Sequence, residues 1–250
     1  MRKFCLALSF LTIFPCSPRS PIERGELAAA AAYFPLVGAA LGLLMGCAVY
    51  LLRLLMPSGP LAALVLAASF LLTRGLHLDG LADTADGLIG AMGREKALKI
   101  MRDSVVGSMG VCALLFVSLF KYAALLAVDA PFFPLAIFSL PFCGRWAMVL
   151  AGAAFAPARP DGLGNRFIGE LRWRHFLYAS FFGAAVIAAA ACFYSRFIPP
   201  MLCGMAVAFI LSLLLSAYAA ERLGGLTGDI LGAVNEIAEA GFLLGVIIWN

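Results

Sequence analysis

Charged side chains are scarce in this sequence. They make up 13% of its 250 residues, while hydrophobic side chains make up 63% and the mean hydropathy is +0.99. Because soluble globular domains carry roughly 25% charged residues, this composition excludes a soluble fold. The chain is predicted to be an integral membrane protein with the lipid bilayer as its surroundings.

Two further patterns are missing. The seven cysteines lie far apart, with no CxxC motif and no histidine cluster beside them, which excludes a zinc site and a disulfide framework. The net charge of +4 comes from short basic segments and not from a continuous stripe. The sequence therefore gives no support for a nucleic-acid partner.

Apolar windows of spanning length are abundant. A helix needs about 20 apolar residues to cross the hydrocarbon core, and seven windows meet this length. They are 27–52, 60–78, 105–128, 132–156, 176–195, 198–220 and 230–249. The predicted fold class is therefore all-α, a polytopic helical membrane bundle that takes in residues 1–250 as a single domain.

Two shorter features refine this bundle. The first apolar stretch, which ends at Pro15, has about eleven residues and is predicted to be an interfacial or re-entrant segment, since it is too short to span. Gly38, Gly42 and Gly46 recur at every fourth position, and such small residues let membrane helices approach closely. The helix in window 27–52 is therefore expected to pack tightly against a neighbour.

An acidic stretch stands out between the second and third windows. Asp79, Asp83 and Asp86 lie at positions i, i+4 and i+7, which fall within roughly 60° of one another on a helix. Like charges on one face repel, and a hard divalent cation with oxygen ligands would offset the repulsion. We therefore predict a metal site here. The alternative is that Asp79 caps a helix and the other two are solvated loop acids.

Basic residues follow this stretch closely. Lys99, Arg102 and Asp103 lie three and four apart and are expected on one face of a short helix. Carboxylates and bases this close together suit a site where metal and cations hold a phosphate chain from both sides. A solvated connector is the alternative. Residues 107–110, GSMG, could also offer backbone N–H groups to an anion at a helix start.

Two cations fall inside predicted spans, where charge is costly. Lys121 and Arg145 are each expected to face the bundle interior, a water-filled cavity or a charged partner. Lys121 could instead snorkel toward the membrane surface.

The last window carries carboxylates. Asp229 and Glu236 lie seven residues apart, hence on one helical face, with Gly232 between them expected to leave that face open to a ligand. Glu236 and Glu239 lie within the apolar window, where unpaired carboxylates are usually functional. We predict that they form a second acidic wall of the same site, reaching the metal or binding the polar part of the substrate.

Five segments stand together as a set. They are residues 10–15, FLTIFP; 33–38, YFPLVG; 77–87, HLDGLADTADG; 100–110, IMRDSVVGSMG; and 225–236, GLTGDILGAVNE. Over nearly the whole chain, this set resembles the hallmark segments of the cobalamin synthase (adenosylcobinamide-GDP ribazoletransferase) family. The family usually has a basic residue directly after Arg-Asp-Ser, where this chain has Val105, so a role for that cation does not carry over.

The resemblance implies a magnesium-dependent transferase at the end of vitamin B12 assembly. It would join adenosylcobinamide-GDP to α-ribazole, or to its 5′-phosphate, and release GMP. Mg²⁺ would be held across the diphosphate by the acidic motif, and the hydroxyl proton would pass to one of its acids or to His77. The predicted site residues are, for catalysis, His77, Asp83, Lys99, Arg102 and Asp103; for substrate binding, Ser104, Ser108, Arg145, Asp229, Asn235, Glu236 and Glu239; and for the metal, Asp79, Asp83 and Asp86.

Two other functions fit parts of the pattern. A CDP-alcohol phosphotransferase would use the same chemistry, and residues 79–83 partly echo that family's acidic signature, but the spacing does not match. A secondary transporter would also place charges in membrane helices, but it predicts an inverted repeat, and the sequence has no visible one. The resemblance leaves the assembly open, including a homo-oligomer or an association with other corrinoid-assembly enzymes.

Charge also predicts orientation, since cytoplasmic loops hold the excess of lysine and arginine. With seven spans, thirteen of the eighteen such residues fall before the first span or after the second, fourth and sixth. The opposite segments carry only Arg53 and Arg196. The N-terminus and the active site are therefore expected to face the cytoplasm, with the chain in a bacterial inner membrane and its C-terminus outside.

Overall fold

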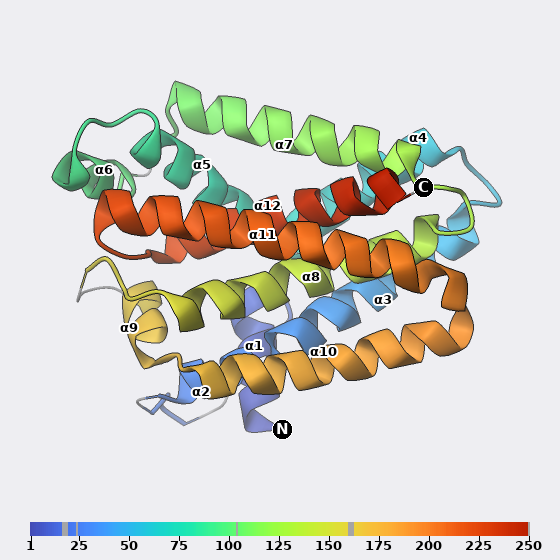
Figure 1. Cartoon of the computed structure of the whole chain (residues 1–250), viewed down its shortest axis with the longest axis horizontal. Coiled ribbons are helices and arrows are strands. Elements are labelled where there is room, and N and C mark those ends of the chain that lie inside the picture. The colour runs from blue at the N-terminus through green and yellow to red at the C-terminus, as the bar shows by residue number, and fades with distance from the viewer. Residues whose placement is uncertain (17–19, 24, 104, 160–162, 250) are drawn as a thin grey trace.

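The computed structural model describes residues 1–16, 20–23, 25–103, 105–159 and 163–249 (Figure 1). Within these ranges the regular structure is helical, apart from an isolated bridge between Pro157 and Leu226. The all-α fold class is thus confirmed. The helices are α1 Arg2–Leu11, α2 Glu26–Ala30, η1 Ala31–Tyr33, α3 Phe34–Leu52, α4 Ser58–Leu72, α5 Leu76–Leu88, α6 Arg94–Ile100, α7 Ser108–Ala127, α8 Phe133–Ala154, α9 Leu163–Glu170, α10 Trp173–Phe193, η2 Ser195–Phe197, α11 Ile198–Leu223 and α12 Gly228–Trp249.

Several of these helices are long and apolar enough to cross a membrane. Among the described residues, five stretches meet this test, and α4 with α5 forms a sixth candidate that is bent by 89°. The five are Glu26–Leu52, Ser108–Ala127, Phe133–Ala154, Ser195–Leu223 and Gly228–Trp249. α10, with 21 residues, covers most of the predicted window 176–195. The membrane bundle is confirmed, while the count of seven spans stays a prediction.

The second predicted window, 60–78, does not form one continuous helix. α4 ends at Leu72, and between it and α5 both Arg74 (φ 55°) and Gly75 (φ 69°) adopt the left-handed conformation. Because a right-handed helix cannot continue through such residues, the chain turns sharply. The acidic motif therefore lies on a short helix of its own.

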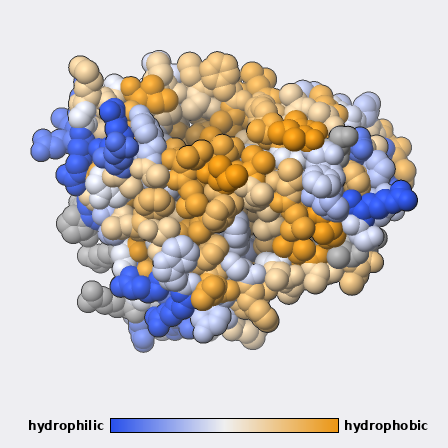
Figure 2. Space-filling model, in the orientation of Figure 1, coloured by the Kyte–Doolittle hydropathy of each residue, from blue (hydrophilic) through white to orange (hydrophobic). Residues whose placement is uncertain are grey.

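Figure 1 shows the long helices running along the molecule between two ends. The basic helix α6, the helix α9 and the connection from α11 to α12 lie at the left end, and the C-terminus lies toward the right. Figure 2 shows hydrophilic residues gathered toward the two ends of this face, with apolar residues across its middle. This is the distribution expected of a bundle with its middle in lipid and its ends in water.

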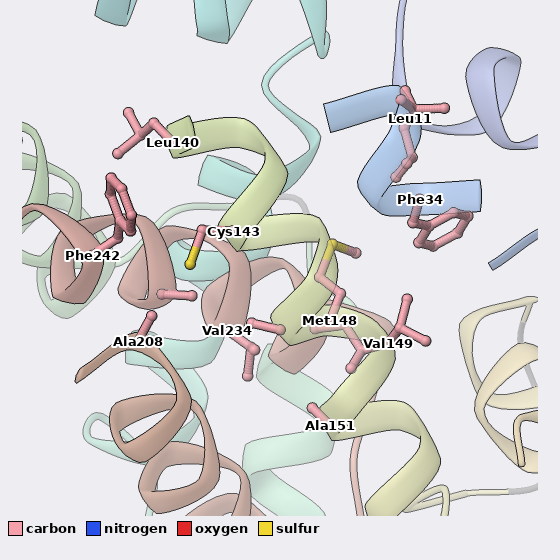
Figure 3. Packing of buried hydrophobic residues seen from close by; sticks show 14 of the residues in the cluster. Leu11, Phe34, Leu140, Cys143, Met148, Val149, Ala151, Ala208, Val234 and Phe242 are labelled. Atoms are coloured by element: carbon pink, nitrogen blue, oxygen red, sulfur yellow. The ribbon is translucent and has the colours of Figure 1, made fainter. Parts of the chain in front are cut away.

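The helices α8 and α12 form the centre of the bundle. Their apolar windows are 83% and 78% buried, whereas that of α7 is 22% buried. Figure 3 shows Leu140 and Cys143 of α8, Ala208 of α11 and Phe242 of α12 gathered where these helices meet. α7 therefore lies at the periphery, with much of its surface left for lipid.

The small-residue stripe on α3 packs against α8, as predicted. A Cβ atom added at Gly42 would overlap the carbonyl oxygen of Phe138, and one added at Gly38 would overlap that of Pro141. Only glycine lets two helix backbones touch in this way. The two helices are consequently locked together along their length.

The N-terminal segment is the short helix α1. It has 10 residues, about half the length that a span requires. Leu6, Ala7 and Leu11 are buried, and α1 contacts α2 and α3. The prediction of a short segment that does not span is confirmed, and α1 packs on the side of the bundle.

Candidate active site

The acidic motif is helical, as predicted. Along α5, Asp79 is exposed, Asp83 is half-buried and Asp86 is buried. The charges of Asp79 and Asp86 both act on the Asp83 carboxylate, so the three lie near one another. Their use as a metal site stays a prediction.

A crossing of α5 and α12 brings a fourth carboxylate to this motif. A Cβ atom on Gly80 would lie 2.6 Å from the backbone oxygen of Asp229, and one on Gly232 would lie 3.2 Å from Gly80 Cα. Glycine at both positions lets the backbones meet. Asp229 therefore lies close enough to Asp83 for its charge to act on that carboxylate. We refer to Asp79, Asp83 and Asp229 as the acidic cluster.

The expectation that Gly232 leaves a face of α12 open to a ligand is wrong. Its missing side chain makes room for α5, because a Cβ there would also lie 3.3 Å from the carbonyl oxygen of His77. The space belongs to helix packing.

Asp86 makes different contacts from its neighbours on α5. Its Oδ2 accepts a hydrogen bond from the Gly107 N–H at 2.7 Å, and its Oδ1 accepts one from the Gly110 N–H at 2.9 Å. Gly107 is the N-cap of α7, so the carboxylate caps that helix and meets the positive end of its dipole. The anion that the sequence led us to expect at residues 107–110 is thus a side chain of the protein itself.

The predicted helical face of Lys99, Arg102 and Asp103 is not formed. α6 ends at Ile100, so Arg102 and Asp103 follow the helix in a turn and loop, and all three side chains are exposed. Ser108, at the start of α7, is also exposed. Ser104 lies outside the described residues. The catalytic and binding roles of these residues stay predictions.

The orientation of α6 follows from its packing. Ala97 and Met101 both lie over Gly87 of α5, where an added Cβ would lie 2.8 Å from the Met101 side chain and 3.3 Å from the Ala97 oxygen. Lys99 is two residues from each of them, which puts it on the opposite side of α6.

Five polar side chains are buried where α7, α8 and α12 meet, and we refer to them as the ionic network. Lys121 Nζ donates to Glu236 Oε2 at 2.6 Å and to Glu239 Oε2 at 2.7 Å. Arg145 Nη1 donates to Glu239 Oε1 at 2.7 Å. Asn235 Nδ2 donates to Oε1 of both glutamates, at 3.2 and 3.1 Å. Two cations thus balance two carboxylates.

The ionic network accounts for the burial of its members. The Lys121 side chain is 5% exposed, so the lysine faces inward and does not snorkel. The contacts of Arg145, Asn235, Glu236 and Glu239 with one another offset much of the cost of placing them in the bundle. Their predicted role in substrate binding stays a prediction.

His77 lies in the first turn of α5, two residues before Asp79. It is 2% exposed, and among the described residues neither ring nitrogen has a hydrogen-bond partner. The charges of Arg145 and Lys121 act on its ring. Its role as a proton acceptor stays a prediction.

Two adjoining cavities connect these groups. The larger, of about 600 Å³, lies between the α4–α5 break and α7, and Asp79 is part of its wall. The smaller, of about 40 Å³, is bordered by Lys121 and Glu236. Phe70, Leu78 and Ser118 line both. The sequence predicted that Asp79 and Glu236 line one site. In the structure, Asp79 lines the larger cavity and Glu236 lines the smaller one next to it.

Comparisons with known proteins add to this geometry. The sequence profile of the family described as Cobalamin-5-phosphate synthase matches residues 3–247. The chain belongs to this family. It is 40% identical to the adenosylcobinamide-GDP ribazoletransferase of Syntrophobacter fumaroxidans, over 94% of each chain. It is 38% identical to that of Geotalea daltonii, over 96% of this chain and 94% of the relative. No solved structure matches it.

In this member of the cobalamin-5-phosphate synthase family, Arg159 is a candidate that sequence reasoning missed. The Ala158 N–H donates to the Leu226 oxygen at 2.8 Å, and this bridge holds the segment after α8 against the start of α12. Arg159 follows directly, and its charge acts on Asp229. The position of Arg159 in a polar loop does not indicate that it lies near Asp229, because the two residues are distant in sequence.

Thr227 is a second missed residue. Its hydroxyl accepts a hydrogen bond from the Ile230 N–H at 3.3 Å and donates one to Asp229 Oδ2 at 3.2 Å. It thereby caps α12 and fixes the direction of the Asp229 carboxylate. A threonine just before an apolar run is a signature of a helix start, so this role was readable from the sequence.

Proposed function

We propose that the chain is an adenosylcobinamide-GDP ribazoletransferase, the name that its relatives carry. One observation of the structure carries the proposal. Asp83 and Asp229 come from two family-like segments far apart in sequence, and the α5–α12 crossing joins them in one acidic cluster. Such a cluster near an open cavity suits the transfer of a phosphorus group between two bound substrates.

The proposed reaction exchanges one bond to phosphorus for another. A hydroxyl oxygen of α-ribazole forms a bond to the phosphorus that carries cobinamide. The bond from that phosphorus to the bridging oxygen breaks, and GMP leaves with the bonding electrons. The hydroxyl proton passes to a carboxylate. Such a reaction requires alignment of the two substrates and neutralisation of charge more than covalent help from the enzyme.

Mg²⁺ suits the donor set. It prefers oxygen ligands and commonly uses one or two carboxylates together with waters and substrate phosphates. Asp83 and Asp229 supply two carboxylates, and Asp79 lies beside them. Among the described residues, no group of three or more His, Cys, Asp or Glu side chains is placed to hold a metal ion by itself. Asp86 is left out, because both of its oxygens bind the backbone of α7. When bound, Mg²⁺ supplies neutralisation of the diphosphate charge.

The remaining roles follow from position. Arg159, whose charge acts on Asp229, stabilises the charge that develops on GMP. Asp79 takes the hydroxyl proton, because it is the exposed member of the cluster and lines the larger cavity. His77 is enclosed among α5, α12 and the ionic network, which makes it a poorer acceptor.

We further propose that the site opens to the cytoplasm of a bacterial inner membrane. The basic helix α6 packs on α5 beside the acidic motif, at the end of the bundle where α11 turns into α12. Positive residues favour the cytoplasmic side. Nucleotide-activated substrates and Mg²⁺ are available there.

The test is a transferase assay on detergent-purified protein. With adenosylcobinamide-GDP, α-ribazole and Mg²⁺, we expect GMP and adenosylcobalamin to appear in equal amounts. A CDP-alcohol phosphotransferase would instead release CMP from a cytidine donor, and a transporter would release no nucleotide. A relative with known transferase activity is assayed in parallel as a positive control. If that control releases GMP and this chain does not, the proposal is refuted.

A further inference from the structure

The larger cavity has apolar walls and a polar end. Phe70 of α4, Leu78 of α5 and Leu114 of α7 supply apolar surface, and Ser118 lies farther along α7. The polar end is formed by Arg74 and Asp79, from the break and the first turns of α5. A ligand that fits must therefore combine a flat or bulky apolar part with a polar part.

Arg74 is conformationally unusual. It is the one non-glycine residue with positive φ (55°) among the described residues. Such backbone conformations are strained for residues other than glycine and are concentrated at functional sites. One guanidinium nitrogen donates to the Ser9 oxygen at 3.2 Å, which ties the arginine to α1. Within the described part of the chain its other N–H groups have no hydrogen-bond partner, so they can bind an anionic group in the cavity.

Size restricts the occupant. Ligand cavities of about 300–1,000 Å³ enclose molecules the size of a nucleoside or a drug. At about 600 Å³, this cavity has room for a nucleoside but not for a corrinoid joined to a guanine nucleotide. Of the two substrates in the proposed reaction, only the acceptor fits.

We infer that this cavity is the acceptor site and binds an aromatic nucleoside, α-ribazole, with its base against Phe70, Leu78 and Leu114. This inference rests on the proposed function. The ribose hydroxyls then lie toward Asp79, at the edge of the acidic cluster, and Arg74 binds the phosphate when the acceptor is the 5′-phosphate. The corrinoid donor approaches the acidic cluster from outside this cavity.

The cavity lies against α7, the least buried of the five candidate spans among the described residues, so a lipid chain is the competing occupant. Charge distinguishes the two. A lipid chain has no use for the Asp79 carboxylate in the cavity wall, whereas a nucleoside hydroxyl needs a carboxylate there.

The test compares two adjacent residues on α7. Leu114→Trp fills the cavity, while Leu115→Trp, at a side chain that is 56% exposed, adds the same bulk toward lipid. We expect Leu114→Trp to raise the KM for α-ribazole at least tenfold and to leave the KM for adenosylcobinamide-GDP within twofold. Leu115→Trp should change neither. If Leu114→Trp does not fold, Val106→Trp fills the cavity from an exposed position on its rim.

A second variant examines the phosphate. Arg74→Gln should raise the KM for α-ribazole 5′-phosphate about tenfold or more, the effect of losing a charge-assisted hydrogen bond, and leave the KM for α-ribazole unchanged. Equal effects on both acceptors would overturn the role of Arg74.

Equilibrium dialysis of labelled α-ribazole without donor separates the two claims. One outcome is that the wild type binds α-ribazole, that Leu114→Trp weakens this binding, and that the wild type shows no turnover. That outcome would refute the proposed function and keep the acceptor site. The other outcome is that the wild type turns over, while the cavity-filling variants Leu114→Trp and Val106→Trp keep the wild-type affinity and KM for the acceptor. That outcome would refute the acceptor site and indicate lipid in the cavity.

Discussion

Asp86 offers the sharpest test of the structure, because sequence reasoning and structure give it different roles. The sequence predicts a metal ligand. In the structure, both oxygens accept hydrogen bonds from the backbone of α7, at 2.7 and 2.9 Å. We predict that Asp86→Asn acts on stability and not on the affinity for Mg²⁺.

The expected size follows from these two bonds. Asparagine keeps one acceptor oxygen but turns an NH₂ group toward the other N–H, so one charge-assisted hydrogen bond is lost. Such a bond contributes about 1.5–3 kcal/mol. At about 2–4 °C per kcal/mol for a chain of this size, the melting temperature should fall by about 3–12 °C. Asp86→Ala, which loses both bonds, should cost about twice as much.

The assay pairs a thermal melt in detergent with an Mg²⁺ titration of GMP release. Asp86→Asn should lower the melting temperature and keep the Mg²⁺ concentration for half-maximal rate within twofold of wild type. Asp83→Asn is the matched control on the same helix, and it should keep the wild-type melting temperature and release no GMP at any Mg²⁺ concentration. A normal melting temperature together with a tenfold higher Mg²⁺ requirement in Asp86→Asn would refute the capping role.

Three further outcomes are expected. Asp83→Asn should abolish turnover in the presence of saturating Mg²⁺, and normal activity there would remove the acidic cluster from the reaction. Lys121→Met should destabilise the protein by about 3–5 kcal/mol in a melt, because it leaves two buried carboxylates with one cation, and adding Glu236→Gln should recover part of the loss; no recovery would argue against the ion pair. A cysteine at Lys96 should resist membrane-impermeant thiol reagents in intact cells and react after permeabilisation, while one at Arg53 should react from outside. The reverse pattern would overturn the orientation.

The sequence predicted what depends on local periodicity. The shared helix of Asp79, Asp83 and Asp86 follows from their spacing, and the tight packing of α3 follows from its small residues. The helix break does not, because window 60–78 is mostly apolar and nothing in its composition requires Arg74 to adopt a left-handed conformation.

Contacts between distant segments were harder to predict. The cost of charge in lipid indicated an inward-facing Glu236, and for Lys121 it gave that position as one of two alternatives. Their pairing did not follow, since 115 residues separate them. Likewise, the open face expected at Gly232 is occupied by α5, because a missing side chain serves equally to admit a ligand or a helix. Spacing alone does not distinguish the two.

The pairing of Lys121 also sets an order of events during biosynthesis. At ~5–20 residues per second, the 115 residues between Lys121 and Glu236 take roughly 6–23 s to synthesise. Throughout that time α7 carries a lysine without its carboxylates, which disfavours its insertion by about 2.5–3.5 kcal/mol at the bilayer centre. The ribosome thus delivers α12, whose glutamates pair with Lys121 of α7, only after α8, α10 and α11. Chains that stall before Glu236 should leave α7 loosely inserted and open to the quality-control proteases of the membrane.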